Sequence, residues 1–212
     1  MTPEELIAEG RKIERQTILL TPNGAGEEAA IWYGNDHQWI TDDLFRCWLA
    51  VDTKYIPNFD NRGWMLILTD DDFTSRELRV EFIPQKPSKN GTRLYPKEIR
   101  LIPPIDAVIA RGSPSVDLWL KKNKWDRQTR YNSNFPDQEA IKPYETLERQ
   151  ENPLYWEEAY ATLGGWHIGW ADDGWHDLID ETLLVHTYRD SEPWLEVWKM
   201  RNGQLKVIER IT

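Results

Sequence analysis

The chain has 212 residues, of which 40% are hydrophobic and 29% charged, with a net charge of −10. This length and this aromatic-rich composition predict one sizeable hydrophobic core and exclude a largely disordered chain. The negative charge excludes a general nucleic-acid binder, which needs a basic face. No segment approaches the roughly 18 consecutive apolar residues of a membrane span, and the first residues lack the apolar core of a signal peptide. We therefore expect a cytoplasmic protein that binds neither nucleic acid nor membranes.

The first element is predicted to be a short helix that ends near Glu14. Thr2 is a suitable N-cap, Pro3 suits the first helical position, and Glu4 and Glu5 supply negative charge in the first turn.

Five strands are predicted next, because five short segments are rich in β-branched and aromatic residues and end at turn-forming residues. These segments are 17–21, 28–34, 45–52, 63–70 and 77–84. Cys47, the single cysteine, lies in the third segment and is expected to be a buried structural thiol. A lone cysteine also excludes a disulfide framework or a cysteine zinc site within one chain.

The middle of the chain is predicted to be mainly helical. Ser113 is a candidate N-cap and Pro114 begins a helix that reaches about Asn123. Three further segments are expected, namely an irregular connection over 131–143, a helix over 144–149 and a helix over 153–163 that stops at Gly164 and Gly165.

A meander of three strands is predicted at the C-terminus, over 181–190, 193–201 and 204–212. Asn202 and Gly203 form a strong hairpin signal between the second and third strands. Alternation in the middle strand places Trp194 and Trp198 on one face, where both are expected to be buried.

These elements predict an α+β fold made of antiparallel sheet with a few helices and the C-terminal meander. We expect a single domain over residues 1–212. A possible subdivision separates a β-rich half, 1–110, from a segment of helices and meander, 111–212.

The segment from Leu163 to Asp180 is the candidate site, because glycines interrupt it and aromatic and charged residues crowd it. Trp166 and Trp170 are expected to be partly exposed walls of a pocket. The candidate binding residues are Trp166, His167, Trp170, Asp172, Asp173 and His176. The alternative is a packing corner, in which these tryptophans belong to the core.

No metal site, cofactor or reaction is predicted from motifs. His176 and Asp180 are four residues apart, and His167 would have to fold back toward them, but no third ligand has diagnostic spacing. The acidic segment 70–81 lacks the glycine and the flanking helices of a calcium loop. Glycine-rich phosphate loops and nucleophile elbows are absent from the sequence as well.

Composition favours a non-enzymatic protein-interaction module that binds a basic protein, for example an immunity or scaffold protein. Residues 151–212 contain 12 acidic and 5 basic residues together with half of the tryptophans. The alternative is a small-molecule or carbohydrate-binding protein, or a hydrolase, that uses an aromatic and acidic pocket at Trp166–His176.

Overall fold

The computed structural model describes residues 1–22, 28–33, 45–60, 62–70, 77–86, 92–111, 113–122, 138–151, 160–167, 178–187 and 194–210. The strands in these ranges are β1 (Arg15–Thr21), β2 (Ile31–Tyr33), β3 (Phe45–Asp52), β4 (Trp64–Asp70), β5 (Leu78–Ile83), β6 (Thr92–Leu101), β7 (Ala161–Gly164), β8 (Thr182–Thr187), β9 (Trp194–Lys199) and β10 (Leu205–Arg210). The helices are α1 (Pro3–Lys12), α2 (Ile105–Arg111), α3 (Pro114–Lys122) and α4 (Gln138–Glu151), with a 3₁₀ turn, η2 (Thr53–Tyr55).

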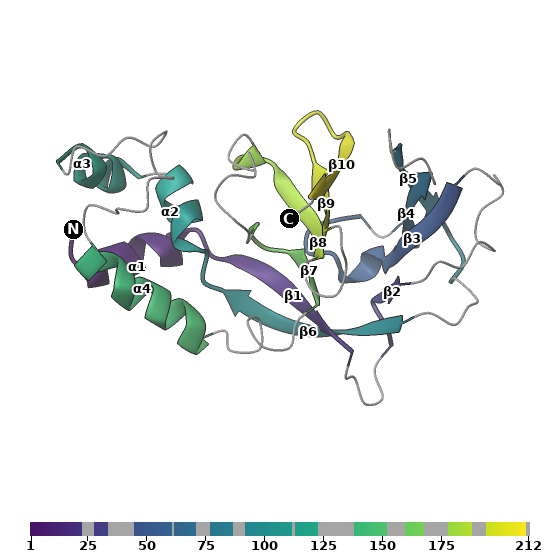
Figure 1. The fold of residues 1–212 in the computed structure, drawn as a ribbon, viewed down its shortest axis with the longest axis horizontal. Helices are drawn as coiled ribbons and strands as arrows, with labels where there is room; N and C mark the ends of the chain where they lie inside the picture. Colours follow the sequence, from purple (N-terminus) through teal and green to yellow (C-terminus); the bar gives the residue numbers. More distant parts are fainter. Residues whose placement is uncertain are drawn as a thin grey trace.

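The ten strands form one antiparallel sheet in the order β10-β9-β8-β7-β1-β6-β2-β3-β4-β5. The two outermost strands, β10 and β5, lie against each other, so the sheet is a nearly closed barrel (Figure 1). The predicted antiparallel sheet with a few helices is confirmed, but the near closure was not predicted. Pairing of β7 with β1 joins residues from both parts of the possible subdivision in one sheet. The single-domain organisation stays a prediction.

The interior of the barrel holds the largest hydrophobic cluster among the described residues. Alternate residues of each strand point inward, as the period of two along a strand requires. The members of this cluster include Ile18, Leu20, Leu49, Val51, Met65, Ile67, Val185 and Val197. Removal of this apolar surface from water is the main force that stabilises the fold.

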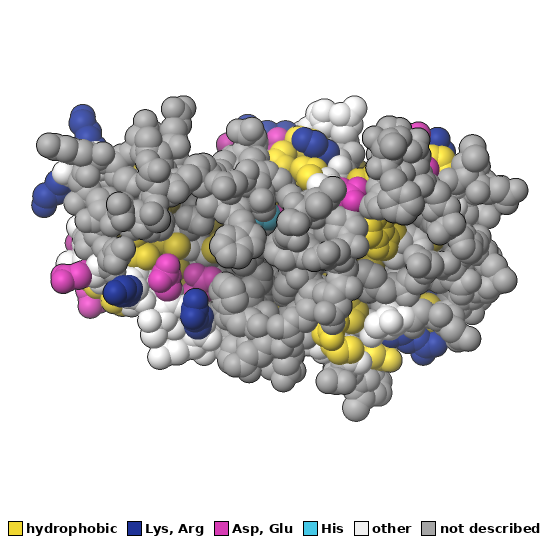
Figure 2. Space-filling view, in the orientation of Figure 1, with side chains coloured by type: hydrophobic (Ala, Val, Ile, Leu, Met, Phe, Trp, Pro, Cys, Tyr) yellow, Lys and Arg dark blue, Asp and Glu magenta, His cyan; other side chains and the backbone are white. Residues whose placement is uncertain are grey.

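The four helices gather at one end of the molecule, beyond the barrel (Figure 1). They share a second core around Leu6, Trp119 and Tyr144. The Tyr144 hydroxyl donates a hydrogen bond of 2.7 Å to the Pro103 carbonyl, and its ring lies directly over Gly10. Acidic and basic side chains are interspersed on the surface of this end (Figure 2). Among the described helices, none is both long and apolar enough to cross a bilayer, and the cytoplasmic location stays a prediction.

The elements with strong local signals fold as predicted. Thr2 caps α1: its Oγ1 accepts from the Glu5 amide at 3.3 Å, and the Glu5 carboxylate accepts from the Thr2 amide at 2.7 Å. The Ser113 Oγ accepts from the Val116 amide at 3.3 Å at the start of α3. The five predicted strands are β1 to β5. Cys47 is buried, and burial raises the pKa of its thiol to about 12, as expected for a structural thiol.

Two elements were not predicted, and one helix begins earlier than expected. Strand β6 contains Pro96 and several charged residues, which are unfavourable in a strand. Its neighbour β2 pairs only as far as Leu94, so Pro96 lies where one side of the strand has no ladder with a described strand. Helix α2 was also missed. Helix α4 begins at Gln138 and contains Pro143, so the expectation of an irregular connection is wrong from residue 138 onward.

The predicted helix over 153–163 is wrong at its end, because Ala161–Gly164 is strand β7. Residues 152–159 lie outside the described part of the chain. Four residues are too few for periodicity to distinguish a strand from a helix end. Strand β7 is stabilised instead by pairing on both sides, with β1 and with β8.

The C-terminal meander is confirmed as β8, β9 and β10. In the β9–β10 hairpin Gly203 has a φ of +83°, and its amide donates to the Met200 carbonyl at 2.8 Å. Trp198 is only 2% exposed, as predicted, and packs with Leu178 and Leu183. The side chain of Trp194 lies outside the described part.

Replacement of Trp198 by alanine should lower the free energy of unfolding by about 3–5 kcal/mol, because a large buried side chain is lost. Denaturant unfolding measures this change. The control is Leu118→Ala: Leu118 is 69% exposed on α3, so its loss should change stability by less than about 0.5 kcal/mol. An unchanged denaturant midpoint in Trp198→Ala would contradict the prediction.

Candidate functional site

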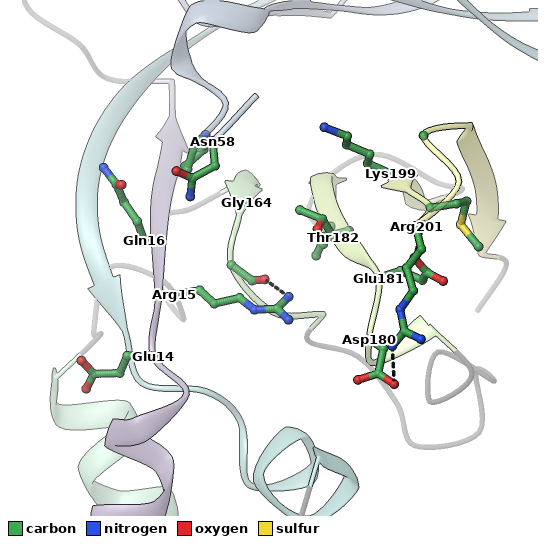
Figure 3. Close-up of a pocket in the computed structure, with 15 residues that line it drawn as sticks. Glu14, Arg15, Gln16, Asn58, Gly164, Asp180, Glu181, Thr182, Lys199 and Arg201 are labelled. Carbon is green, nitrogen blue, oxygen red and sulfur yellow. Dashed lines mark hydrogen bonds and ion pairs between the residues drawn. The ribbon is translucent and has the colours of Figure 1, made fainter. Parts of the chain in front are cut away.

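A cleft of about 510 Å³ lies where β7 ends. Strand β1 extends beyond its last partner on β7, since Thr17 is opposite Gly164 and Arg15 and Gln16 have no β7 residue beside them. Strand β8 likewise extends past β7 toward its start at Thr182. The gap between β1 and β8 is therefore a direct result of the shortness of β7 (Figure 3).

Two glycines turn the chain away from this gap. Gly164 and Gly165 have φ values of +71° and +83°, which L side chains rarely adopt. A Cβ on Gly165 would lie 2.4 Å from the Thr17 Oγ1, and one on Gly164 would lie 3.1 Å from the Gln16 carbonyl oxygen. The pair was predicted to terminate a helix, but it terminates a strand.

Four connections contribute to the cleft: the α1–β1 junction, the β3–β4 connection, the β7–β8 connection and the β9–β10 hairpin. Charged residues line it from both sides, namely Glu14, Arg15, Asp180, Glu181, Lys199 and Arg201.

The acidic residues of the cleft are engaged by arginines. The Arg201 guanidinium forms an ion pair of 2.7 Å with Asp180, and the Arg201 amide donates to the Glu181 carboxylate at 2.7 Å. Glu14 forms an ion pair with Arg11. These carboxylates therefore already have cationic or N–H partners.

Two basic residues of the cleft have no carboxylate partner among the described residues. The Arg15 guanidinium stacks on the Trp166 ring, 3.5 Å from its centre, and donates to the Gly165 carbonyl at 3.3 Å. Burial, together with the charge of Arg111, lowers the pKa of Arg15 to about 10, so it remains charged at neutral pH. The Lys199 Nζ lies over the Phe59 ring, 5.6 Å from the ring centre. In Figure 3 both side chains reach toward the cleft.

A second polar group of interest is a buried cluster on the outer face of β8 and β9. His186 on β8 lies opposite Glu196 on β9. The His167 Nδ1 is 2.8 Å from the Glu196 Oε1, and the rings of His167 and His186 stack with centres 5.0 Å apart. The other carboxylate oxygen of Glu196 accepts from the Trp198 Nε1 at 2.7 Å. All three members of the cluster are at most 1% exposed.

The structure describes two of the six predicted site residues. Trp166 is 3% exposed, so the expectation of a partly exposed wall is wrong for this residue. It is covered by Arg15 and Ala107, and its Nε1 donates to the Ile13 carbonyl at 2.9 Å. His167 is also buried. Trp170, Asp172, Asp173 and His176 lie outside the described residues, and their role in binding stays a prediction.

The residues that the structure brings together were not predicted from the sequence. Spacing associated His167 with His176 and Asp180, but Asp180 is exposed and paired with Arg201. His167 instead lies beside His186 and Glu196. Glu196 alternates with Val197 in β9 and so shares the face of Trp198, but its partner on β8 cannot be read from the sequence because the register shifts between Leu183 and Val185.

Gly165→Ala should destabilise the protein more than Gly203→Ala does. Both glycines have a φ of +83°, but a Cβ on Gly203 meets nothing within 4 Å, whereas one on Gly165 meets Thr17. Gly203→Ala should therefore cost only the left-handed strain of about 1–2 kcal/mol. Gly165→Ala should cost at least about 1 kcal/mol more because of the clash. Equal losses in denaturant unfolding would show that Thr17 does not constrain the turn.

The cleft and the buried cluster are thus two groupings of chemically useful side chains in the described structure. In comparisons, the chain matches no protein-family model, no curated protein and no solved structure. Its function therefore has to be argued from these two groupings themselves.

Proposed function

We propose that this protein binds a small organic anion, such as a carboxylate or a phosphate ester, in the cleft at the end of β7. The observation that carries the proposal is the pair Arg15 and Lys199. Both line the same cleft, and neither forms an ion pair with a carboxylate of the described residues.

Burial of the Arg15 guanidinium is unfavourable, because it removes part of its hydration, and the charge of Asp180, which is ion-paired with Arg201, offsets this only in part. An anion in the cleft supplies further counter-charge through charge-assisted hydrogen bonds. Guanidinium has five N–H donors in a planar fork, and the described contacts use one of them, to Gly165. Stacking on Trp166 fixes the plane of the fork before the ligand arrives, which lowers the entropic cost of binding.

The remaining lining suits a small polar ligand. Gln16, Asn58 and Thr182 contribute amide and hydroxyl groups. A volume of about 510 Å³ is within the range of small-molecule sites. Asp180 and Arg201 neutralise each other on the β8 side (Figure 3), so the negative end of the ligand is directed toward Arg15 and Lys199.

The net charge of −10 does not oppose a small anion strongly. At physiological ionic strength the screening length is about 8 Å, so distant acidic residues contribute little inside the cleft. Long polyanions would still meet the acidic surface as a whole, which is consistent with the prediction that nucleic acid is not a partner.

Binding is favoured over hydrolysis by the chemistry of the lining. The described residues around the cleft include no serine, cysteine or histidine, and their carboxylates are engaged by arginines. A sugar site would need an exposed aromatic face, which the buried Trp166 does not offer. The protein-interaction function stays a prediction, since net charge and tryptophan content alone support it.

Thermal unfolding and calorimetry with citrate, inorganic phosphate and uncharged glucose, at constant ionic strength, test the proposal. Citrate or phosphate should raise the melting temperature and glucose should not. Lys199→Gln should weaken anion binding by about 10- to 100-fold, the usual value of a charge-assisted hydrogen bond.

The matched control is Lys206→Gln, which removes the same charge from an exposed position on β10 that does not line the cleft. It should leave the affinity within about twofold, because exposed charges are screened. Equal weakening by both substitutions would show general electrostatics rather than a site. No stabilisation by either anion would contradict the proposed function.

A further inference from the structure

We propose that His167, His186 and Glu196 form a structural binding site for a divalent transition metal ion, with zinc the best fit. This inference does not depend on the cleft, which shares no residue with the cluster. It replaces the expectation from sequence that the chain has no metal site.

The geometry of the three donors fits a single ion. Each residue offers one ligand atom, and these atoms all lie within 4.8 Å of one another. In a tetrahedral zinc site, bonds of about 2.0–2.2 Å place the ligand atoms roughly 3.4 Å apart. Small side-chain rotations therefore suffice to bring the three donors onto one ion, without movement of the strands.

The donor types also fit zinc. Two imidazole nitrogens and one carboxylate oxygen are a frequent ligand set for zinc, whereas calcium and magnesium prefer oxygen donors alone. The Trp198 Nε1 holds the second carboxylate oxygen of Glu196 at 2.7 Å. Such an outer hydrogen bond orients a ligand and leaves the other oxygen, Oε1, on the side of His167.

The charges of the cluster are compatible with a metal ion. A buried carboxylate is stabilised by nearby positive charge. A divalent ion supplies such charge and binds both imidazoles in their neutral form together with the carboxylate. The stacked rings of His167 and His186, with centres 5.0 Å apart, bring the two imidazoles to the same place.

Burial favours a structural role for this ion. A catalytic ion keeps a position open to substrate, whereas these three residues are at most 1% exposed, so a buried water would take the fourth tetrahedral position. Through its bonds to the three ligands, the ion would link the segment after β7, which carries His167, to the meander strands β8 and β9. Metal binding would then contribute directly to the stability of this part of the fold.

The first test uses the untagged, full-length wild-type protein. Elemental analysis should find about one zinc per chain after dialysis. A chelator should lower the melting temperature by about 5–10 °C. This is the stabilisation expected when free zinc is present at about 100 times the dissociation constant of the site. Fewer than about 0.1 metal ions per chain, with the same melting temperature in added zinc and in chelator, would overturn the proposal.

The second test uses variants. His186→Gln and Glu196→Gln should lose the zinc and the effect of the chelator. The matched control is Thr162→Val, because Thr162 lies opposite His186 on β7, is equally buried and is not a ligand. This variant should keep both properties. Retention of zinc by His186→Gln would place the metal elsewhere and overturn the proposal.

If the ligand variants do not fold, a spectroscopic measurement on the wild-type chain tests the proposed metal site. Cobalt(II) substituted for zinc should give the intense visible absorption of a tetrahedral site with nitrogen and oxygen ligands, without the sulfur charge-transfer band of a thiolate ligand. A spectrum like that of hydrated cobalt would overturn the proposal.

Discussion

The pairing of strand β7 with β1 and β8 is the constraint on which the rest of the structure depends. β7 consists of four residues, yet in the described sheet it alone connects β1 through β6 with the C-terminal meander. Without it, β1 and β8 would each present an unpaired edge, and the barrel could not approach closure. The same strand ends after Gly164, and its early end leaves the space that becomes the cleft. One short element therefore determines both the continuity of the barrel and the position of the candidate site.

Three consecutive residues after this strand belong to three different environments. Gly165 accepts a hydrogen bond from Arg15 at the cleft. The Trp166 ring stacks against the guanidinium of the same arginine. His167 enters the buried cluster with Glu196. Because these three residues are adjacent in the chain, the geometry of the cleft and that of the cluster both depend on the same turn. A change in the conformation of this turn would affect both sites, although they have no side chain in common.

Most elements with strong local signals could be predicted from the sequence. The Thr2 cap, the Ser113-Pro114 helix start and the Asn202-Gly203 hairpin depend on neighbouring residues, so local chemistry is enough to identify them. Strands β6 and β7 could not be found in this way. The first contains Pro96, and the second is too short for periodicity, so both exist because neighbouring strands pair with them. Such pairing is a property of the whole sheet rather than of the segment.

The candidate sites were less predictable than the fold, for the same reason. Crowding of tryptophan and charge between Leu163 and Asp180 made this segment the candidate site, and its role in binding stays a prediction. The exposure of Trp166, however, depends on Arg15, which is 151 positions away in the chain and reaches it only through the pairing of β1 with β7. The cluster depends on the register shift between β8 and β9, which brings His186 opposite Glu196. Neither register nor strand length can be obtained from the composition of a single segment.

The seam between β5 and β10 has a consequence for motion within the barrel. The two strands are in contact, but they are the ends of the hydrogen-bonded order, and among the described residues no backbone ladder joins them. In the described sheet each of them pairs with a strand on one side only, so separation of the seam breaks side-chain contacts but no ladder between described strands. The barrel can therefore widen there at lower free-energy cost than between any other neighbouring strands. Amide hydrogen exchange should accordingly begin at the seam and proceed inward, with the slowest exchange in β1 and β6 on the opposite side of the sheet.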